Sequence, residues 1–169
     1  GGGRIVGEDL APRSNRVFGL AEALFVDGGH AAVERFARAS IVGDRFVFQS
    51  EVFFDTGKAT LDKPEGRAEL DGLASALLEL EKKIPGEIPW VLRVDGHTDL
   101  RPIYSPQFKN NWELSAARAI SVVQYLVAKG VSPQRLVAAG FGEFQPIDSD
   151  KTDEAFNRNR RIELKLTER

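Results

Sequence analysis

An acid and a base that lie nineteen residues apart are placed to meet in the folded protein. Asp99 closes the tetrad GHTD at residues 96–99, which follows a run of apolar residues, and Arg118 lies in a helical pattern that begins at Asn111. A carboxylate can hold an ammonium group, and a guanidinium can bind a carboxylate through two charge-assisted hydrogen bonds. The pair therefore fits a site for a zwitterion. It also fits a structural salt bridge, which needs no ligand.

Metal binding and hydrolysis fit these residues less well. His97 and Asp99 have the spacing of two metal ligands, but zinc needs a third protein ligand, and the only other histidine is His30. We therefore expect His97 to orient the turn through hydrogen bonds. A glycosidase pair of Asp99 with Glu113 or Asp55 needs one carboxyl with a raised pKa, whereas a nearby arginine lowers the pKa of carboxyl groups. The sequence favours a binding module over an enzyme, with no metal and no cofactor.

Four segments have the composition of strands. Residues 45–54 are rich in aromatic and β-branched residues and are followed by turn-forming residues, and residues 90–94 form a mostly apolar run. Residues 136–141 form a third strand, in which glycine interrupts the pattern. Residues 161–167 alternate between apolar and polar side chains, so we expect a strand with one exposed face.

Helices are predicted between these strands. Leucines at steps of three and four predict a helix that follows Pro64 and ends at Ile84. A second helix begins after Asn110, which can cap it together with Glu113, and it ends at Gly130. This alternation predicts an α+β fold in which the helices pack on one face of a mixed sheet.

The composition limits the classes of partner. A chain of 169 residues with 42% hydrophobic and 28% charged residues can bury one core as a soluble domain. The net charge of −2 disfavours nucleic acid as a partner, and the absence of cysteine excludes disulfides and thiol catalysis. No apolar run approaches the ~18 residues of a membrane span. The opening GGG is typical of a linker or tag remnant, so we expect that a membrane or secretion segment has been removed upstream.

Four motifs in one order carry a resemblance to a known family: GHTD at 96–99, NWELSAARA at 111–119, GFGEFQPI at 140–147 and NRNRRIEL at 157–164. They resemble the peptidoglycan-binding domain shared by OmpA-type outer-membrane proteins, peptidoglycan-associated lipoproteins and MotB-type flagellar stator proteins. The resemblance spans Phe46 to about Leu166, and the loop at residues 100–110 is more similar to the MotB branch. It implies a β-α-β-α-β two-layer sandwich.

The resemblance also implies a function and a set of site residues. Matched position by position, Asp99 and Arg118 hold the zwitterionic end of a diaminopimelate-type residue in the peptidoglycan stem peptide. Positions that line the same pocket in the family are Thr98, Asn111, Leu114, Phe54 and Asp55. A helix cap, a core contact and a turn are the ordinary alternatives for Asn111, Leu114 and Asp55. The sequence 159–161 matches a segment that braces the binding loop.

The resemblance further implies an anchor of the bacterial periplasm. Such a domain ties a membrane-tethered protein, for example a MotB-like stator component of the flagellar motor, to the cell wall. An outer-membrane or lipoprotein tether is the alternative, and a peptidoglycan hydrolase is a more remote one.

Residues 1–42 are expected to form an N-terminal extension, and residues 43–169 the peptidoglycan-binding domain. Apolar residues at helical spacing between Leu10 and Phe25 and between Ala32 and Ala37 predict two short helices. These helices can cover the domain, or they can serve a linker or a homodimer. A dimer suits an anchor, because once one domain has bound a repeating polymer, the second domain meets further binding sites at high effective concentration.

Overall fold

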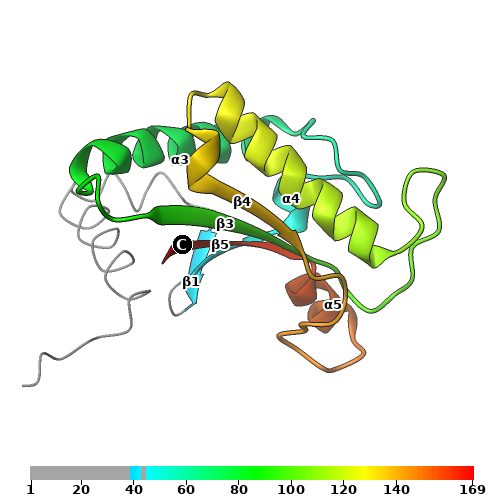
Figure 1. Cartoon of the computed structure of the whole chain (residues 1–169). Helices are drawn as coiled ribbons and strands as arrows, with labels where there is room; N and C mark the ends of the chain where they lie inside the picture. Colours follow the sequence, from blue (N-terminus) through cyan, green and yellow to red (C-terminus); the bar gives the residue numbers. More distant parts are fainter. Residues whose placement is uncertain (1–38, 43–44) are drawn as a thin grey trace, which may run out of the picture.

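A five-stranded sheet with two long helices on one face makes up most of the computed structural model, which describes residues 39–42 and 45–169 (Figure 1). The strands are β1 (Ala39–Val42), β2 (Arg45–Gln49), β3 (Trp90–His97), β4 (Leu136–Gly140) and β5 (Arg161–Glu168). Their order is β1-β2-β5-β3-β4, with β3 parallel to β4 and every other neighbouring pair antiparallel. The predicted α+β fold with a mixed sheet is therefore confirmed. The predicted N-terminal helices lie outside the described residues.

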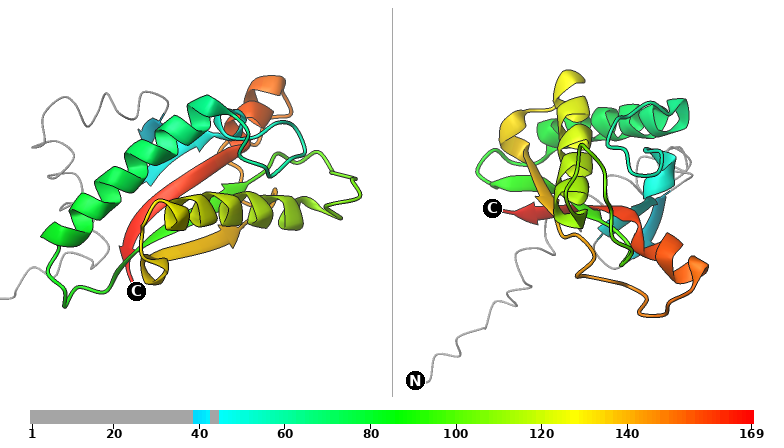
Figure 2. Two further views of the ribbon diagram at one scale, coloured as in Figure 1. Left: turned by 90° about the horizontal axis from the view of Figure 1, so that it is seen from above. Right: turned by 90° about the vertical axis from the view of Figure 1, so that its right-hand side faces the viewer.

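Both long helices cross the same face of the sheet. The helices are α3 (Pro64–Lys83), α4 (Asn111–Ala128) and the short α5 (Asp153–Asn159), and two 3-10 turns, η1 (Ser50–Val52) and η2 (Pro133–Arg135), join elements. Seen from above, α3 and α4 lie over the strands, whereas α5 lies apart at one end of the sheet (Figure 2). Within the described residues, no helix has the length and apolar character needed to cross a bilayer.

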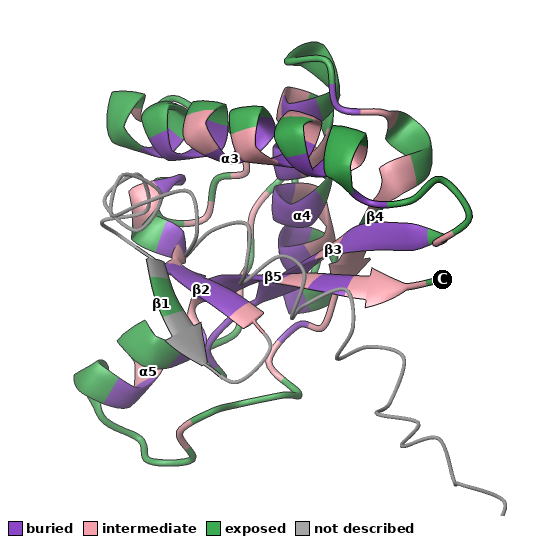
Figure 3. Ribbon diagram, turned by 90° about the vertical axis from the view of Figure 1, so that its left-hand side faces the viewer, coloured by how far each residue is buried: buried purple, intermediate pink, exposed green. Residues whose placement is uncertain are grey.

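The core lies between the helices and the sheet. Figure 3 shows buried residues on the sides of α3 and α4 that face the strands and exposed residues on their outer sides. Leu70, Leu77 and Leu80 supply the buried face of α3, as their spacing predicts, and they pack against sheet residues such as Trp90 and Leu164. This packing holds the ends of β2 and β3 in fixed positions relative to α4.

The first predicted strand is shorter than expected. β2 ends at Gln49, because the backbone turns into η1, where Phe53 N and Phe54 N both donate to Ser50 O, at 3.0 and 2.9 Å. Phe53 and Phe54 therefore lie after a turn rather than in a strand. β3 is longer than expected, because its pairing with β5 continues as far as His97.

The predicted exposed face of the last strand is also wrong for its first half. Arg161 and Glu163 are both buried, and Arg161 Nε donates to Glu163 Oε1 at 2.8 Å. Arg45 Nη1 donates to the other carboxylate oxygen at 2.6 Å. Burial acts to raise the pKa of Glu163, but His97, Arg161 and Arg45 lower it well below its ordinary value. Alternation in the sequence cannot reveal this, because a paired charge can be buried at a polar position.

Two glycines allow α4 to lie directly on the sheet. Gly96 of β3 and Gly140 of β4 are register partners. A Cβ atom on Gly96 would lie 2.2 Å from the backbone oxygen of Ser115, and one on Gly140 would lie 2.5 Å from the backbone nitrogen of Ala116. The first turns of α4 are therefore set by backbone contact with the end of β3.

Candidate ligand-binding pocket

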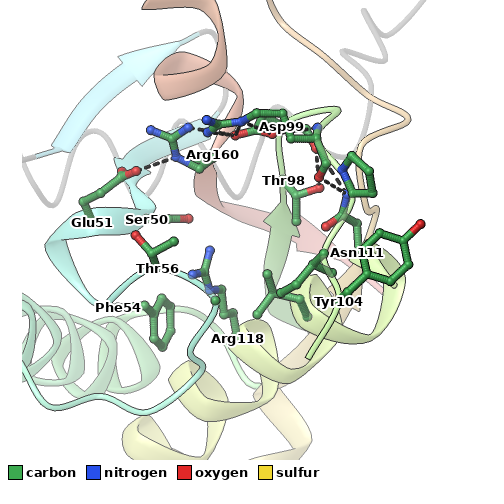
Figure 4. A pocket seen from close by; sticks show the side chains of 15 residues that line it. Ser50, Glu51, Phe54, Thr56, Thr98, Asp99, Tyr104, Asn111, Arg118 and Arg160 are labelled. Carbon is green, nitrogen blue, oxygen red and sulfur yellow. Dashed lines mark hydrogen bonds and ion pairs between the residues drawn. The ribbon is translucent and has the colours of Figure 1, made fainter. Parts of the chain in front are cut away.

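A pocket of about 370 Å³ opens where the ends of β2 and β3 meet the start of α4 (Figure 4). Its wall comes from η1 and the loop after it, from the loop after β3, from the first two turns of α4 and from Arg160, which follows α5. The lining residues are Ser50, Glu51, Phe54, Thr56, Gly57, Thr98, Asp99, Arg101, Pro102, Ile103, Tyr104, Asn111, Leu114, Arg118 and Arg160. Segments far apart in the sequence thus form one concave site.

Six of the seven predicted site residues line this pocket: Asp99, Arg118, Leu114, Thr98, Asn111 and Phe54. Asp55 is the exception. Its side chain is exposed and lies 3.6 Å from Lys63 Nζ, while its backbone oxygen accepts a hydrogen bond from Arg118. Asp55 therefore contributes its main chain to the site, because the turn after η1 directs its carboxylate elsewhere.

Arg118 is a buried cation that has no acidic partner within residues 39–42 and 45–169. The residue is 4% exposed, its Nε donates to Lys58 O at 2.8 Å, and its Nη2 donates to Asp55 O at 3.1 Å. The guanidinium lies over the Phe54 ring, 5.2 Å from its centroid. Among the described residues, no carboxylate forms a salt bridge with it. Burial lowers the pKa of Arg118 to about 10, so the group stays charged at neutral pH.

Asp99 is paired with two other arginines. Arg101 Nη2 donates to its Oδ2 at 2.6 Å, and Arg160 Nη1 donates to the same oxygen at 2.7 Å. Burial acts to raise the pKa of Asp99, but the hydrogen bonds from Arg101 and Arg160 bring it below its ordinary value, so the group is ionised at neutral pH. The alternative of a direct Asp99–Arg118 salt bridge is therefore wrong. The two charges lie on opposite walls of the pocket (Figure 4).

Arg160 connects two walls of the pocket. Its Nε donates to Glu51 at 2.5 Å, and its backbone oxygen accepts from Ser50 N at 3.0 Å, so it ties η1 to Asp99. Arg161 donates to Gln145 O at 2.8 Å, within the loop that precedes α5. These contacts are of the kind expected for the predicted brace. Arg158, in contrast, pairs with Asp148 at the surface.

A model of the OmpA family matches residues 53–160 of the chain. The chain belongs to the OmpA family. The resemblance carried by the four motifs is thereby confirmed, and the match lies within the predicted span. It includes every lining residue of the pocket except Ser50 and Glu51.

Individual relatives of this OmpA-family chain include outer membrane proteins and a motility protein. It is 35% identical over 83% of its length to the uncharacterized protein YtxE and 34% identical over 72% to Motility protein B, both of Bacillus subtilis (strain 168). It covers 54% and 44% of these two proteins, so it spans about half the length of the curated relatives that it matches.

Solved structures show the same fold. A putative MotB-like protein from Desulfovibrio vulgaris superposes with a TM-score of 0.77 at 25% identity, covering 92% of this chain and 96% of that one. The cell wall anchor of the type VI secretion system from Pseudomonas aeruginosa superposes with a TM-score of 0.65 at 28% identity, covering 87% and 96%.

Sequence reasoning missed Ser50, Arg101 and Tyr104 in the OmpA-family pocket. The Ser50 hydroxyl is buried and has no hydrogen-bond partner among the described residues. It was overlooked because its segment was predicted to be a strand, in which alternate side chains point away from each other. Arg101 and Tyr104 belong to the loop after Asp99, and the side chains of this loop carry no periodic signal.

The expected role of His97 is wrong. Both ring nitrogens are buried without a hydrogen-bond partner among the described residues, and the ring stacks on Phe141 with centroids 4.9 Å apart. Its Nε2 lies 3.6 Å from Glu163. The turn is instead held by the backbone, because Thr98 N donates to Gly142 O at 2.9 Å. No group of three potential metal ligands occurs within residues 39–42 and 45–169.

The N-terminus of α4 is capped by hydrogen bonds much as the sequence predicts. Asn110 caps the helix by accepting from Glu113 N at 2.9 Å. The Glu113 carboxylate reaches back to Lys109 N at 2.7 Å, one residue earlier than a capping box requires. Asn111 Nδ2 donates to Arg101 O at 3.0 Å and to Glu143 at 2.6 Å. Asn111 therefore holds the loop after Asp99 against the helix.

Proposed function

We propose that this OmpA-family domain binds peptidoglycan without cleaving it and that it recognises the zwitterionic end of a diaminopimelate-type residue in the stem peptide. Arg118 takes the carboxylate of that residue, and Asp99 takes its ammonium. The observation that carries the proposal is the buried Arg118 guanidinium, which faces the pocket and, within the described part of the chain, donates its hydrogen bonds to backbone oxygens and pairs with no carboxylate.

Burial of a charge is costly unless an opposite charge accompanies it, so a carboxylate ligand is the natural partner of Arg118. Nε and Nη2 hold the guanidinium on the turn after η1, and this anchorage presets its direction. A fixed guanidinium binds a carboxylate with less loss of conformational freedom than a free one. Phe54, Leu114 and Ile103 supply apolar surface for the carbon chain of the ligand.

The role in the cell follows from the ligand. We infer that the domain anchors a membrane-tethered periplasmic protein to the cell wall, as a MotB-like stator component would require. The similarity to Motility protein B and to a type VI secretion cell wall anchor supports a role as a cell wall anchor of this kind. An outer-membrane tether is the second candidate, because OmpA of Bordetella avium is 36% identical over 83% of the chain. A homodimer, with two peptidoglycan-binding domains, would bind the wall more strongly in either case.

Binding without turnover is the direct test. The purified protein is expected to co-sediment with purified sacculi, and a free stem tripeptide that ends in diaminopimelate should release it. No soluble muropeptides should appear in the supernatant by chromatography. Release of muropeptides would overturn the assignment as a binding module, and failure to sediment with sacculi would overturn the ligand.

Ser50 is expected to contribute a hydrogen bond to the bound ligand. Ser50→Ala should weaken binding of the tripeptide a few fold, because a typical hydrogen bond contributes about 1 kcal/mol. The same change should leave thermal stability unchanged or slightly raised, since it removes a buried hydroxyl that has no partner among the described residues. Calorimetric titration and a thermal melt measure the two quantities. Unchanged affinity would show that the hydroxyl does not meet the ligand.

A further inference from the structure

Both oxygens of the Asp99 carboxylate already accept at least two hydrogen bonds each in the structure. Oδ1 accepts from the Arg101 backbone N–H at 2.8 Å and from Arg101 Nε at 3.1 Å. Oδ2 accepts from Arg101 Nη2 at 2.6 Å and from Arg160 Nη1 at 2.7 Å, and Arg101 Nε also lies 3.2 Å from it. A carboxylate offers about four lone-pair directions, so an incoming ammonium finds no free acceptor. An ammonium can bind Asp99 only if one arginine side chain leaves.

The two arginines differ in how firmly the protein holds them. The Arg160 side chain is 26% exposed, is bonded to Glu51 at 2.5 Å and extends from a backbone that is itself bonded to Ser50. The Arg101 side chain is 53% exposed and belongs to a loop. Water and salt reach the Arg101 side of its ion pair with the buried Asp99 and weaken it, and a loop side chain regains conformational freedom when it leaves. Arg101 is therefore the side chain that leaves at lower cost.

We propose that the Arg101 guanidinium occupies the ammonium subsite on Asp99 and that a ligand must displace it in order to bind. This inference rests on the proposed function and names the residue that sets its selectivity. The backbone N–H of Arg101 stays on Oδ1 when the side chain moves, so the carboxylate keeps its orientation. The guanidinium already lies over the Phe156 ring, 4.8 Å from its centroid. This cation–π contact can stabilise the side chain after it leaves Asp99.

Displacement makes Asp99 selective for ligands with an ammonium group. A ligand that lacks a cation cannot replace Arg101, so it leaves the carboxylate paired and gains nothing from Asp99. A ligand that carries an ammonium group replaces the partly exposed Arg101–Asp99 ion pair with an ion pair between its own cation and the same carboxylate. The cost is a lower apparent affinity, because only the fraction of molecules with Arg101 off Asp99 is ready to bind. For an ion pair of ordinary strength, removal of Arg101 should raise the affinity about fivefold.

The test is calorimetric titration of a stem tripeptide that ends in diaminopimelate into the wild-type chain and into Arg101→Ala. We expect Arg101→Ala to bind about fivefold more tightly. Arg101→Gln keeps a polar side chain at this position without the charge, and it should show the same gain. Lys151→Ala is the matched control, because it removes one positive charge from an exposed residue outside the pocket, and it should bind within twofold of wild type. The tripeptide with its terminal side-chain amine acetylated should gain nothing from either Arg101 variant.

The outcomes separate this inference from the function on which it rests. If the wild type binds the tripeptide and both Arg101 variants bind equally or more weakly, Arg101 contacts the ligand and the displacement model is overturned. If both variants gain affinity equally for the native and the acetylated tripeptide, the gain is not at an ammonium subsite, and the model is again overturned. If neither wild type nor variants bind the tripeptide, the proposed function itself fails and the displacement model fails with it.

Discussion

Arg118→Ala is expected to lose binding to the stem tripeptide by roughly thirtyfold or more, because removal of one member of a buried, hydrogen-bonded charge pair typically costs 2–5 kcal/mol. The ligand carboxylate would enter a pocket whose wall no longer offers a cation. The protein should still fold, with a lower unfolding midpoint, since the backbone oxygens of Asp55 and Lys58 lose a donor at a cost of about 1–3 kcal/mol. Titration well below the midpoint measures the affinity of the folded state.

Two matched variants separate charge from anchorage in this experiment. Ser121 lies one turn along α4 from Arg118 and donates to Ala59 O at 2.6 Å, so Ser121→Ala loosens the same loop without removing a charge. Arg67 also donates to a backbone oxygen, that of Leu61, but lies outside the pocket, so Arg67→Ala removes a charge elsewhere. Both variants should bind within a few fold of wild type. A loss in Ser121→Ala as large as in Arg118→Ala would mean that Arg118 acts only by holding the loop.

Gly96→Ala is expected to destabilise the fold by about 3 kcal/mol or more, which lowers the unfolding midpoint by roughly 6–12 °C for a domain of this size. The added Cβ would lie 2.2 Å from Ser115 O. This oxygen belongs to the helix backbone, so the clash can be relieved only if α4 and β3 move apart. Because α4 carries Asn111, Leu114 and Arg118 to the pocket, affinity for the tripeptide should fall as well.

Gly86→Ala is the control for this substitution. An added Cβ there meets nothing within 4 Å, so the change should stay within about 0.5 kcal/mol of wild type. Thermal melts of the two variants give the comparison directly. Equal midpoints would mean that α4 adjusts freely over the end of β3, contrary to the tight contact described above.

The sequence predicts those parts of the site that depend on local signals. Asn110 and Glu113 mark the start of α4 because capping is a contact between residues a few positions apart. The four motifs place Asp99 at the end of β3 and Arg118 on α4, and six of the seven named residues line the pocket. The strands and helices are also predicted from local signals, because each type of element has its own spacing of apolar residues. Their order along the chain then predicts the mixed sheet.

Side-chain pairing across the fold is what the sequence could not reveal. Asp99 and Arg160 are 61 residues apart, and although the resemblance indicates a brace at residues 159–161, no local pattern indicates that Arg160 pairs with Asp99. Ser50 was missed because a turn replaced the end of a predicted strand. The burial of Glu163 on a face predicted to be exposed depends on Arg45, which comes from another strand. Each of these contacts forms only when distant elements meet.

The anchorage of Arg118 also predicts how this site tolerates evolutionary change. Its two donors go to main-chain oxygens, those of Lys58 and Asp55, so substitutions of these two side chains leave the guanidinium in place as long as the turn keeps its shape. Gly57, which lies between them with φ at +70°, is far less replaceable, because other residues rarely adopt that backbone conformation. Descendants of this domain should therefore drift at positions 55 and 58 while retaining glycine at position 57.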